Sequence, residues 1–366
     1  MPRHANRPDL RALILWLDAS VAAVALTVVV GGITRLTESG LSITEWRPIA
    51  GVLPPLSASA WAEAYAKFLA IPQAQTIHAG ITLAAFKGIF WWEFFHRIAA
   101  RFVGLVIAVP FLWFWATGRI PPGLKGRLAS LPLLVLAQGA LGWYMVSSGL
   151  SVRVNVSQYR LAAHLGLALV ILVVALWTSA SLRAASRAPT DTAPGDGGRA
   201  PAVRSASTGA FDHTRFARIA DGFAIWTFLV ILSGAFVAGL RAGKIYNTFP
   251  LMGGQVVPPG YDTLDGFFTN AFENPAAAQF HHRVFAILTV CVAFGLWFWV
   301  GAATGAPSRL VRAQRNVAVV ASVQVALGIA TLLLAVPIAI AALHQLTAVA
   351  LLGAAVLAAH EARARP

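Results

Sequence analysis

Four histidines recur in this sequence as two pairs, one in each half, and their side chains could bind metal. The pairs are His96 with His164 and His282 with His344. Neutral imidazole is a common ligand of transition metals, and two imidazoles facing each other between helices can hold the iron of a planar macrocycle. A structural zinc site needs four ligands. The pattern therefore favours two bis-histidine haem sites, and the alternative is an interhelical hydrogen bond at each pair.

An acidic side chain precedes the first of these histidines and has no charged counterpart in the second half. Glu93 lies three residues before His96, whereas Gln279 lies three residues before His282. Because side chains at i and i+3 share a helix face, we expect Glu93 to reach the same pocket as His96. A carboxylate near the membrane is costly and usually functional, although an ion pair with a neighbouring arginine is the alternative. We predict that one haem is chemically altered beside Glu93 and that the other is kept.

An arginine follows one histidine of each pair, Arg97 in the first half and Arg283 in the second. Each points in a different direction around the helix from its histidine. Two roles fit, contact with haem propionates or snorkelling of the charge to the membrane boundary. The Gly- and Pro-rich segments 34–55 and 240–260 are expected to cover the pockets as lids, since irregular backbone must be covered or wet; plain linkers are the alternative.

The chain that positions these groups is strongly apolar. Of its 366 residues 58% are hydrophobic and only 11% are charged, against about a quarter charged in soluble domains. Its single cysteine, Cys291, excludes an internal disulfide and a CxxCH haem attachment. We predict an all-α integral membrane protein with eight runs of the roughly 20 residues that cross a bilayer, at 13–33, 91–116, 128–147, 158–180, 218–240, 280–302, 315–336 and 338–360.

The net charge of +14 reflects topology rather than nucleic-acid binding. More than half of the 28 Lys and Arg residues fall in alternate connections, on the same side as both termini. The positive-inside rule places that side in the cytoplasm. The aromatic "LWFW" at 112–115 marks one water interface, so the histidines are expected toward the opposite, periplasmic side.

The two halves also resemble each other outside the histidines. "AQGALG" at 137–142 matches "VQVALG" at 323–328 by the same offset that relates His96-Arg97 to His282-Arg283. Residues 182–215 are rich in Ala, Pro, Gly, Ser and Arg, which is typical of a linker. We predict two four-helix bundles as parallel repeats, related by an axis along the membrane normal. The expected domains are an N-terminal bundle at 1–181, a cytoplasmic linker at 182–217 and a C-terminal bundle at 218–366.

Four stretches carry a resemblance to a known family, and it extends over all eight expected helices. They are "GGITRLTESGLSITEWRPIAGVLPP" at 31–55, "LAAFKGIFWWEFFHR" at 83–97, "RLAAHLG" at 160–166 and "QFHHR" at 279–283. The chain resembles the haem A synthases of bacterial and mitochondrial inner membranes, in particular the alphaproteobacterial and mitochondrial-type branch. Some relatives carry cysteine pairs in the external loops, and this sequence has none.

The resemblance implies an oxidoreductase of a bacterial inner membrane that converts the ring methyl of haem O to the formyl group of haem A, destined for cytochrome oxidase. It implies that His96 and His164 flank the substrate iron, that His282 and His344 ligate a haem b cofactor, and that Glu93 is the catalytic carboxylate. It also implies contact with the haem O synthase and with cytochrome oxidase assembly factors. A homo-oligomer is compatible with the sequence.

Two other classes of protein remain as alternatives. A bis-histidine dihaem electron-transfer cytochrome would keep two permanent, similar haems and would not need Glu93. A transporter built from repeats would carry an interrupted helix at mid-membrane, whereas here the polar groups gather near one face.

Overall fold

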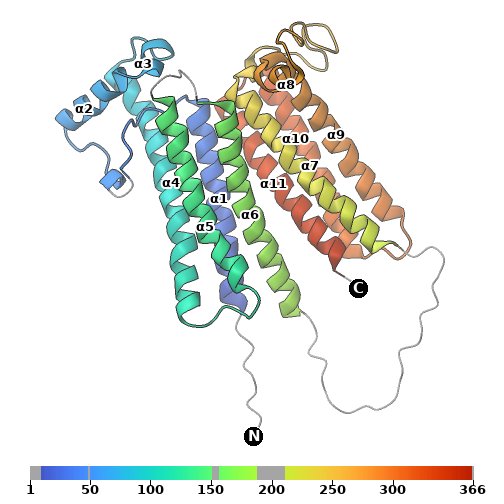
Figure 1. Ribbon diagram of the computed structural model, residues 1–366. Helices are drawn as coiled ribbons and strands as arrows, with labels where there is room; N and C mark the ends of the chain where they lie inside the picture. The colour runs from blue at the N-terminus through green and yellow to red at the C-terminus, as the bar shows by residue number, and fades with distance from the viewer. Residues whose placement is uncertain (1–9, 48–49, 151–155, 188–210, 365–366) are drawn as a thin grey trace, which may run out of the picture.

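Eight long helices form two groups of four that lie side by side in the computed structural model (Figure 1). The structure describes residues 10–47, 50–150, 156–187 and 211–364. All eight are long and apolar enough to cross a membrane, and no strand occurs in the described ranges. The prediction of an all-α membrane protein with eight spans is confirmed. The first group is α1 (Leu10–Leu36), α4 (Leu83–Ala116), α5 (Lys125–Gly149) and α6 (Gln158–Arg187), and the second is α7 (His213–Gly239), α9 (Pro275–Ala302), α10 (Ser308–Leu333) and α11 (Ile338–Arg363).

The helices of each group contact one another in the same order. In the first group α1 packs against α4 and α6, and α5 packs against α4 and α6. In the second group α7 packs against α9 and α11, and α10 packs against α9 and α11. The groups meet where α6 contacts α7 and α11 and where α1 contacts α11. Helices α1, α6, α7 and α11 therefore form the centre of the molecule.

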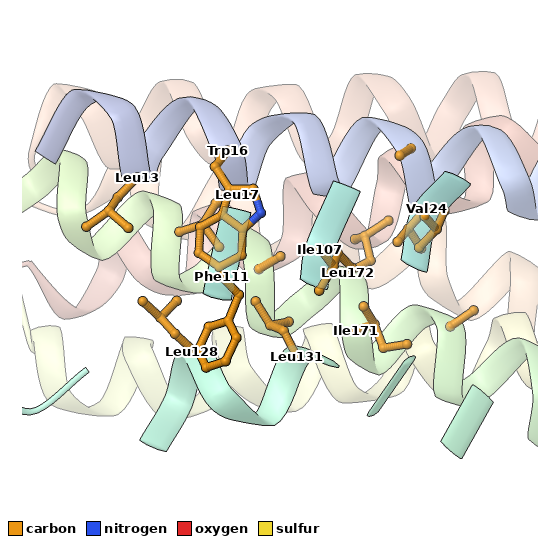
Figure 2. Close-up of a cluster of buried hydrophobic side chains, with 14 of the residues drawn as sticks. Leu13, Trp16, Leu17, Val24, Ile107, Phe111, Leu128, Leu131, Ile171 and Leu172 are labelled. Atoms are coloured by element: carbon orange, nitrogen blue, oxygen red, sulfur yellow. The ribbon is translucent and has the colours of Figure 1, made fainter. Parts of the chain in front are cut away.

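Side chains fill the interior of each group, while lipid can solvate its outer surface. Figure 2 shows Leu17, Ile107, Leu131 and Leu172, which come from the four helices of the first group and are at most 2% exposed. Large apolar side chains such as Leu133 remain exposed. In a bilayer this exposure costs nothing, because hydrocarbon tails are as apolar as the side chains. The helical backbone satisfies its own hydrogen bonds there.

Two helix boundaries differ from those expected. Helix α4 begins at Leu83, after a cap in which Thr82 Oγ1 accepts a hydrogen bond from the Ala85 amide. His96 consequently lies well inside this helix instead of in its first turns. Helix α6 runs on to Arg187 and α7 begins at His213, so helices occupy both ends of the predicted linker 182–217. The rest of that linker, 188–210, lies outside the described residues.

Short helices cover one end of the two groups (Figure 1). Helix α2 rests on the extended start of α4 through an aromatic cluster in which Phe68 and Phe86 are completely buried and Trp61 packs edge-on against Phe90. This cluster explains why α4 begins so early, since its first turns have α2 to pack against. The short helices are η1 (Ala50–Val52), α2 (Ala58–Leu69) and α3 (Pro72–Thr76) in the first external segment, and η2 (Ala242–Lys244) and α8 (Phe267–Glu273) in the second.

One ion pair closes each group at the end opposite the short helices (Figure 1). Asp18 of α1 pairs with Arg183 of α6, and Asp221 of α7 pairs with Arg363 of α11. Both pairs join the first and fourth long helices of their group. Both pairs are partly exposed, so each adds a modest link between the two helices that it joins.

Candidate functional site

One cavity of about 720 Å³ is lined by all four paired histidines and extends across both helix groups. His96 reaches it from α4, His164 from α6, His282 from α9 and His344 from α11. Its volume lies within the range of small-molecule sites. Within the described ranges, no group of three or more His, Cys, Asp and Glu side chains is arranged to hold a metal ion. Among the described residues the cavity thus lacks the four ligands of a structural zinc site.

Each of the four imidazoles lies against a glycine of the neighbouring helix. A Cβ atom added at these glycines would stand 2.8 to 3.0 Å from the Cε1 atom of the ring. Such contacts are too short for a side chain, so glycine lets the helices approach and holds each ring in a close-fitting groove. The pairs are Gly31 with His96, Gly142 with His164, Gly234 with His282 and Gly328 with His344.

The two histidine pairs differ in what holds the ring through Nδ1. His282 Nδ1 lies 2.8 Å from Ser233 Oγ, and His344 Nδ1 lies 3.1 Å from the Gln324 carbonyl oxygen. In the first pair Nδ1 of both His96 and His164 is buried and has no partner of hydrogen-bonding geometry within the described part of the chain, although the Thr27 carbonyl is near the His96 ring. A hydrogen bond at Nδ1 fixes the ring and leaves Nε2 to bind metal. In the second pair both Nδ1 atoms thus have a partner, which would leave Nε2 available to a metal.

Glutamine amides mark where Nε2 points. Gln138 Nε2 lies 3.3 Å from His164 Nε2, and Gln324 Nε2 lies 3.5 Å from His344 Nε2. Both glutamines line the cavity, as the histidines do. The residues present fit a haem, since the imidazoles would supply nitrogen ligands for its iron and the glycines leave room for the rings.

The Gly328→Ala variant tests the groove directly. Its Cβ would stand 2.9 Å from His344 Cε1, so the ring must turn away, and overpacking of this kind costs about 1–3 kcal/mol. We expect haem bound by the second pair to dissociate roughly 10-fold faster, measured by transfer to an excess of apomyoglobin. Gly295→Ala is the control, because nothing lies within 4 Å of its added Cβ. Equal rates for both variants would contradict this role of the groove.

Glu93 is buried, with 2% of its surface exposed, and lines the cavity. Its Oε1 accepts from Arg97 Nε at 3.0 Å and Nη2 at 2.6 Å, and its Oε2 accepts from Ser42 Oγ at 2.8 Å and from the Ile43 amide at 2.7 Å. Glu93 therefore forms the ion pair with a neighbouring arginine and also reaches the cavity that His96 lines. Four hydrogen bonds fix the carboxylate in one place.

The equivalent position in the second group behaves differently. Gln279 is also buried, and its Nε2 donates to the Tyr246 carbonyl at 3.2 Å. Glu93 lines the cavity, whereas Gln279 does not. Only the first site therefore has a carboxylate at the cavity wall at this position.

Arg97 and Arg283 tie the external segments to the bundle in matching ways. Arg97 donates through Nη1 to the Glu45 carbonyl at 2.8 Å and through Nη2 to the Ile43 carbonyl at 2.6 Å. Arg283 donates to the Thr248 and Tyr246 carbonyls at the same two distances. Of these two arginines, Arg97 lines the cavity and Arg283 does not. Both arginines bond to loop carbonyls, Arg97 also pairs with Glu93, and the propionate role stays a prediction.

Replacing Arg283 with Lys should loosen the second external segment. A lysine has a single nitrogen and cannot reproduce the fork that bonds two carbonyls at once. Each lost bond to a charged donor is worth about 1.5–3 kcal/mol, so we expect hydrogen exchange of the amides around 245–249 to speed up at least about 10-fold. Arg309→Lys, at an exposed position of α10, is the control. Unchanged exchange in Arg283→Lys would show that the segment is held by other contacts.

Polar residues that join the two groups also line the cavity, and their pairing was not predicted from the sequence. Arg35 Nη2 donates to the Ala238 carbonyl at 3.0 Å, and Arg241 forms an ion pair with Glu38 at 2.5 Å. Gln345, next to His344 in sequence, donates to the Val28 carbonyl at 2.9 Å. These partners are far apart in sequence and follow no period. A signal does exist in the sequence, since charged side chains directly follow apolar runs that end near 33 and 240.

Comparison with known proteins is consistent with this geometry. Residues 14–356 match the family described as cytochrome oxidase assembly protein, COX15-CtaA. A "Heme A synthase" of Maricaulis maris is 43% identical over 365 residues, covering 99% of both chains. The "Heme A synthase" of Rhizobium johnstonii is 44% identical, covering 97% of this chain and 90% of the relative, and that of Rhizobium meliloti is 44% identical, covering 96% and 89%. The chain belongs to the cytochrome oxidase assembly protein family, together with these haem A synthases.

Proposed function

We propose that this chain is a haem A synthase that oxidises the ring methyl of haem O to the formyl group of haem A. One observation carries the proposal beyond the family: the Glu93 carboxylate lines the same cavity as the four paired histidines, whereas Gln279 lies off its wall. A protein that only relayed electrons would have no need for an acidic group fixed by four hydrogen bonds at one of its two sites.

The two pairs then have separate roles. His96 and His164 flank the iron of the substrate haem O, and His282 and His344 ligate a resident haem b. The Nδ1 contacts to Ser233 and Gln324 support this division, because a permanent cofactor benefits from ligands that are already oriented. A substrate that must leave as product is better served by rings without such a contact.

Glu93 acts on the substrate through its fixed position. Its carboxylate can accept a proton from an attacking water or hydroxyl, which is worth about 10²–10⁴-fold in rate. It can also stabilise positive charge that develops at the oxidised carbon. Arg97, Ser42 and the Ile43 amide hold the carboxylate for both tasks. When bound, the haem b supplies electron-transfer chemistry, which the surrounding apolar wall shields from water.

The family and the eight spans make the protein a multi-pass membrane protein. We place it in a bacterial inner membrane with both termini in the cytoplasm and the histidines toward the periplasm. We also propose that the domains are parallel repeats. The contacts of α6 with α7 and of α1 with α11 correspond under a twofold axis that passes between α6 and α11. Haem O synthase and oxidase assembly factors are the proposed partners, one delivering the substrate and the others receiving the product.

To test the function, haem O is supplied to membranes that contain the protein but no other haem A synthase. The haems are then extracted and identified by mass spectrometry. Haem A is expected in these membranes and absent from membranes without the protein. If haem O demonstrably reaches the protein and leaves unaltered, the electron-transfer cytochrome becomes the better account.

A further inference from the structure

The hydroxyl of Ser233 in α7 has two close neighbours. It lies 2.7 Å from the Val230 carbonyl oxygen, one turn earlier in the same helix, and 2.8 Å from His282 Nδ1 in α9. The Val230 carbonyl also faces the same imidazole. A carbonyl only accepts hydrogen bonds, so the serine proton goes to Val230 and the serine oxygen accepts from Nδ1–H.

This assignment determines the tautomer of His282. With the proton on Nδ1, the lone pair is on Nε2, the form that binds a metal. If the serine donated to Nδ1 instead, its oxygen and the Val230 oxygen would face each other at 2.7 Å with no proton between them. The contact therefore holds the ring both in direction and in protonation.

The first group has no serine at the position equivalent to Ser233. Gly31 and Gly234 hold the equivalent histidines, so the residue before each glycine is also equivalent, and it is Val30 in one group and Ser233 in the other. The Thr27 carbonyl is near the His96 ring, but Nδ1 has no partner of hydrogen-bonding geometry among the described residues. A valine at this place contributes no donor and no acceptor.

We infer that Ser233 is a positioning residue that makes His282 a lasting haem ligand, and that the difference between Ser233 and Val30 helps decide which site keeps its haem. The inference rests on the proposed assignment of haem b to the second pair. A hydrogen-bonded partner of a ligating histidine raises the basicity of the ligand and fixes its orientation, and its loss typically costs about 10–100-fold in metal affinity. The same bond favours ferric iron, so it also lowers the reduction potential.

The test uses the full-length protein in nanodiscs, with haem b transfer to apomyoglobin and redox titration as readouts. Ser233→Val is expected to release haem b about 10–100-fold faster and to raise its midpoint potential, while Ser233→Thr, which keeps the hydroxyl, restores both values. Val30→Ser, the reciprocal change, is expected to slow the release of haem O from the first site.

Comparing His282→Ala with Ser233→Val distinguishes a wrong role for Ser233 from a wrong assignment of haem b to the second pair. If His282→Ala protein keeps haem b, the assignment itself fails. If His282→Ala loses haem b while folded Ser233→Val matches the wild type in both release and potential, the assignment stands and the role of Ser233 is overturned. A release rate that rises equally in Ser233→Val and Ser233→Thr would show a packing effect rather than a hydrogen bond, and would overturn it as well.

Discussion

Glu93→Gln protein is expected to bind both haems and to convert haem O at least about 100-fold more slowly than the wild type. The amide keeps the size of the side chain, and its one oxygen can still accept hydrogen bonds either from Arg97 or from Ser42 and the Ile43 amide. It cannot take up a proton or offset positive charge on the substrate. Haem O or a partly oxidised intermediate should therefore accumulate, and extraction with mass analysis of the haems measures this directly.

The matched control is Gln279→Glu, which places a carboxylate at the equivalent position of the second group. Because Gln279 does not line the cavity, we expect this variant to produce haem A at close to the wild-type rate. Unreduced conversion by Glu93→Gln, with wild-type amounts of bound haem, would remove Glu93 from the mechanism and leave it with the single role of holding the loop at Ser42 and Ile43.

The His282→Ala variant should lose haem b from the purified protein. The change removes a proposed ligand of the haem b iron, so we expect the haem b content to fall at least about 10-fold. The proposed electron-transfer route to the substrate would be lost with it, and haem A formation should stop. Absorbance of the reduced protein and pyridine haemochrome analysis measure the content.

His281→Ala is the control for this variant, because His281 is the next residue and bonds to the Tyr261 hydroxyl at 2.9 Å instead of lining the cavity. It should keep its haem b. Loss of haem b in both variants would indicate that the start of α9 had been disturbed in general, and retention in both would place the cofactor elsewhere.

The sequence was sufficient to predict the eight spans, for physical reasons, and it singled out four histidines that line the cavity. A bilayer imposes a minimum length of apolar helix, so spans appear as runs that need no knowledge of their neighbours. The relation between Glu93 and His96 follows from helix geometry alone. These predictions use contacts within one helix, which the order of residues determines.

Contacts between segments were not predictable in the same way. Ser42 and Ile43 reach Glu93 from a loop about 50 residues earlier, and Ser233 reaches His282 from another helix. Neither contact follows a period. The early start of α4 depends on packing against α2, which the apolar pattern at 91–116 does not reveal. The glycine grooves could be found only once the facing helices were known.

The ion pair between Glu38 and Arg241 has a consequence for how the protein can be assembled. The two residues occupy corresponding places just after α1 and α7, both with left-handed backbone, φ +56° and +55°, and they bind each other across the middle of the molecule. In a dimer of two identical halves, the residue at this place would meet its own copy. Two first halves would oppose two carboxylates and two second halves would oppose two guanidiniums, so like charges would repel at the centre. The ion pair therefore favours association of one first half with one second half. Separate halves that are co-expressed should recombine in this way.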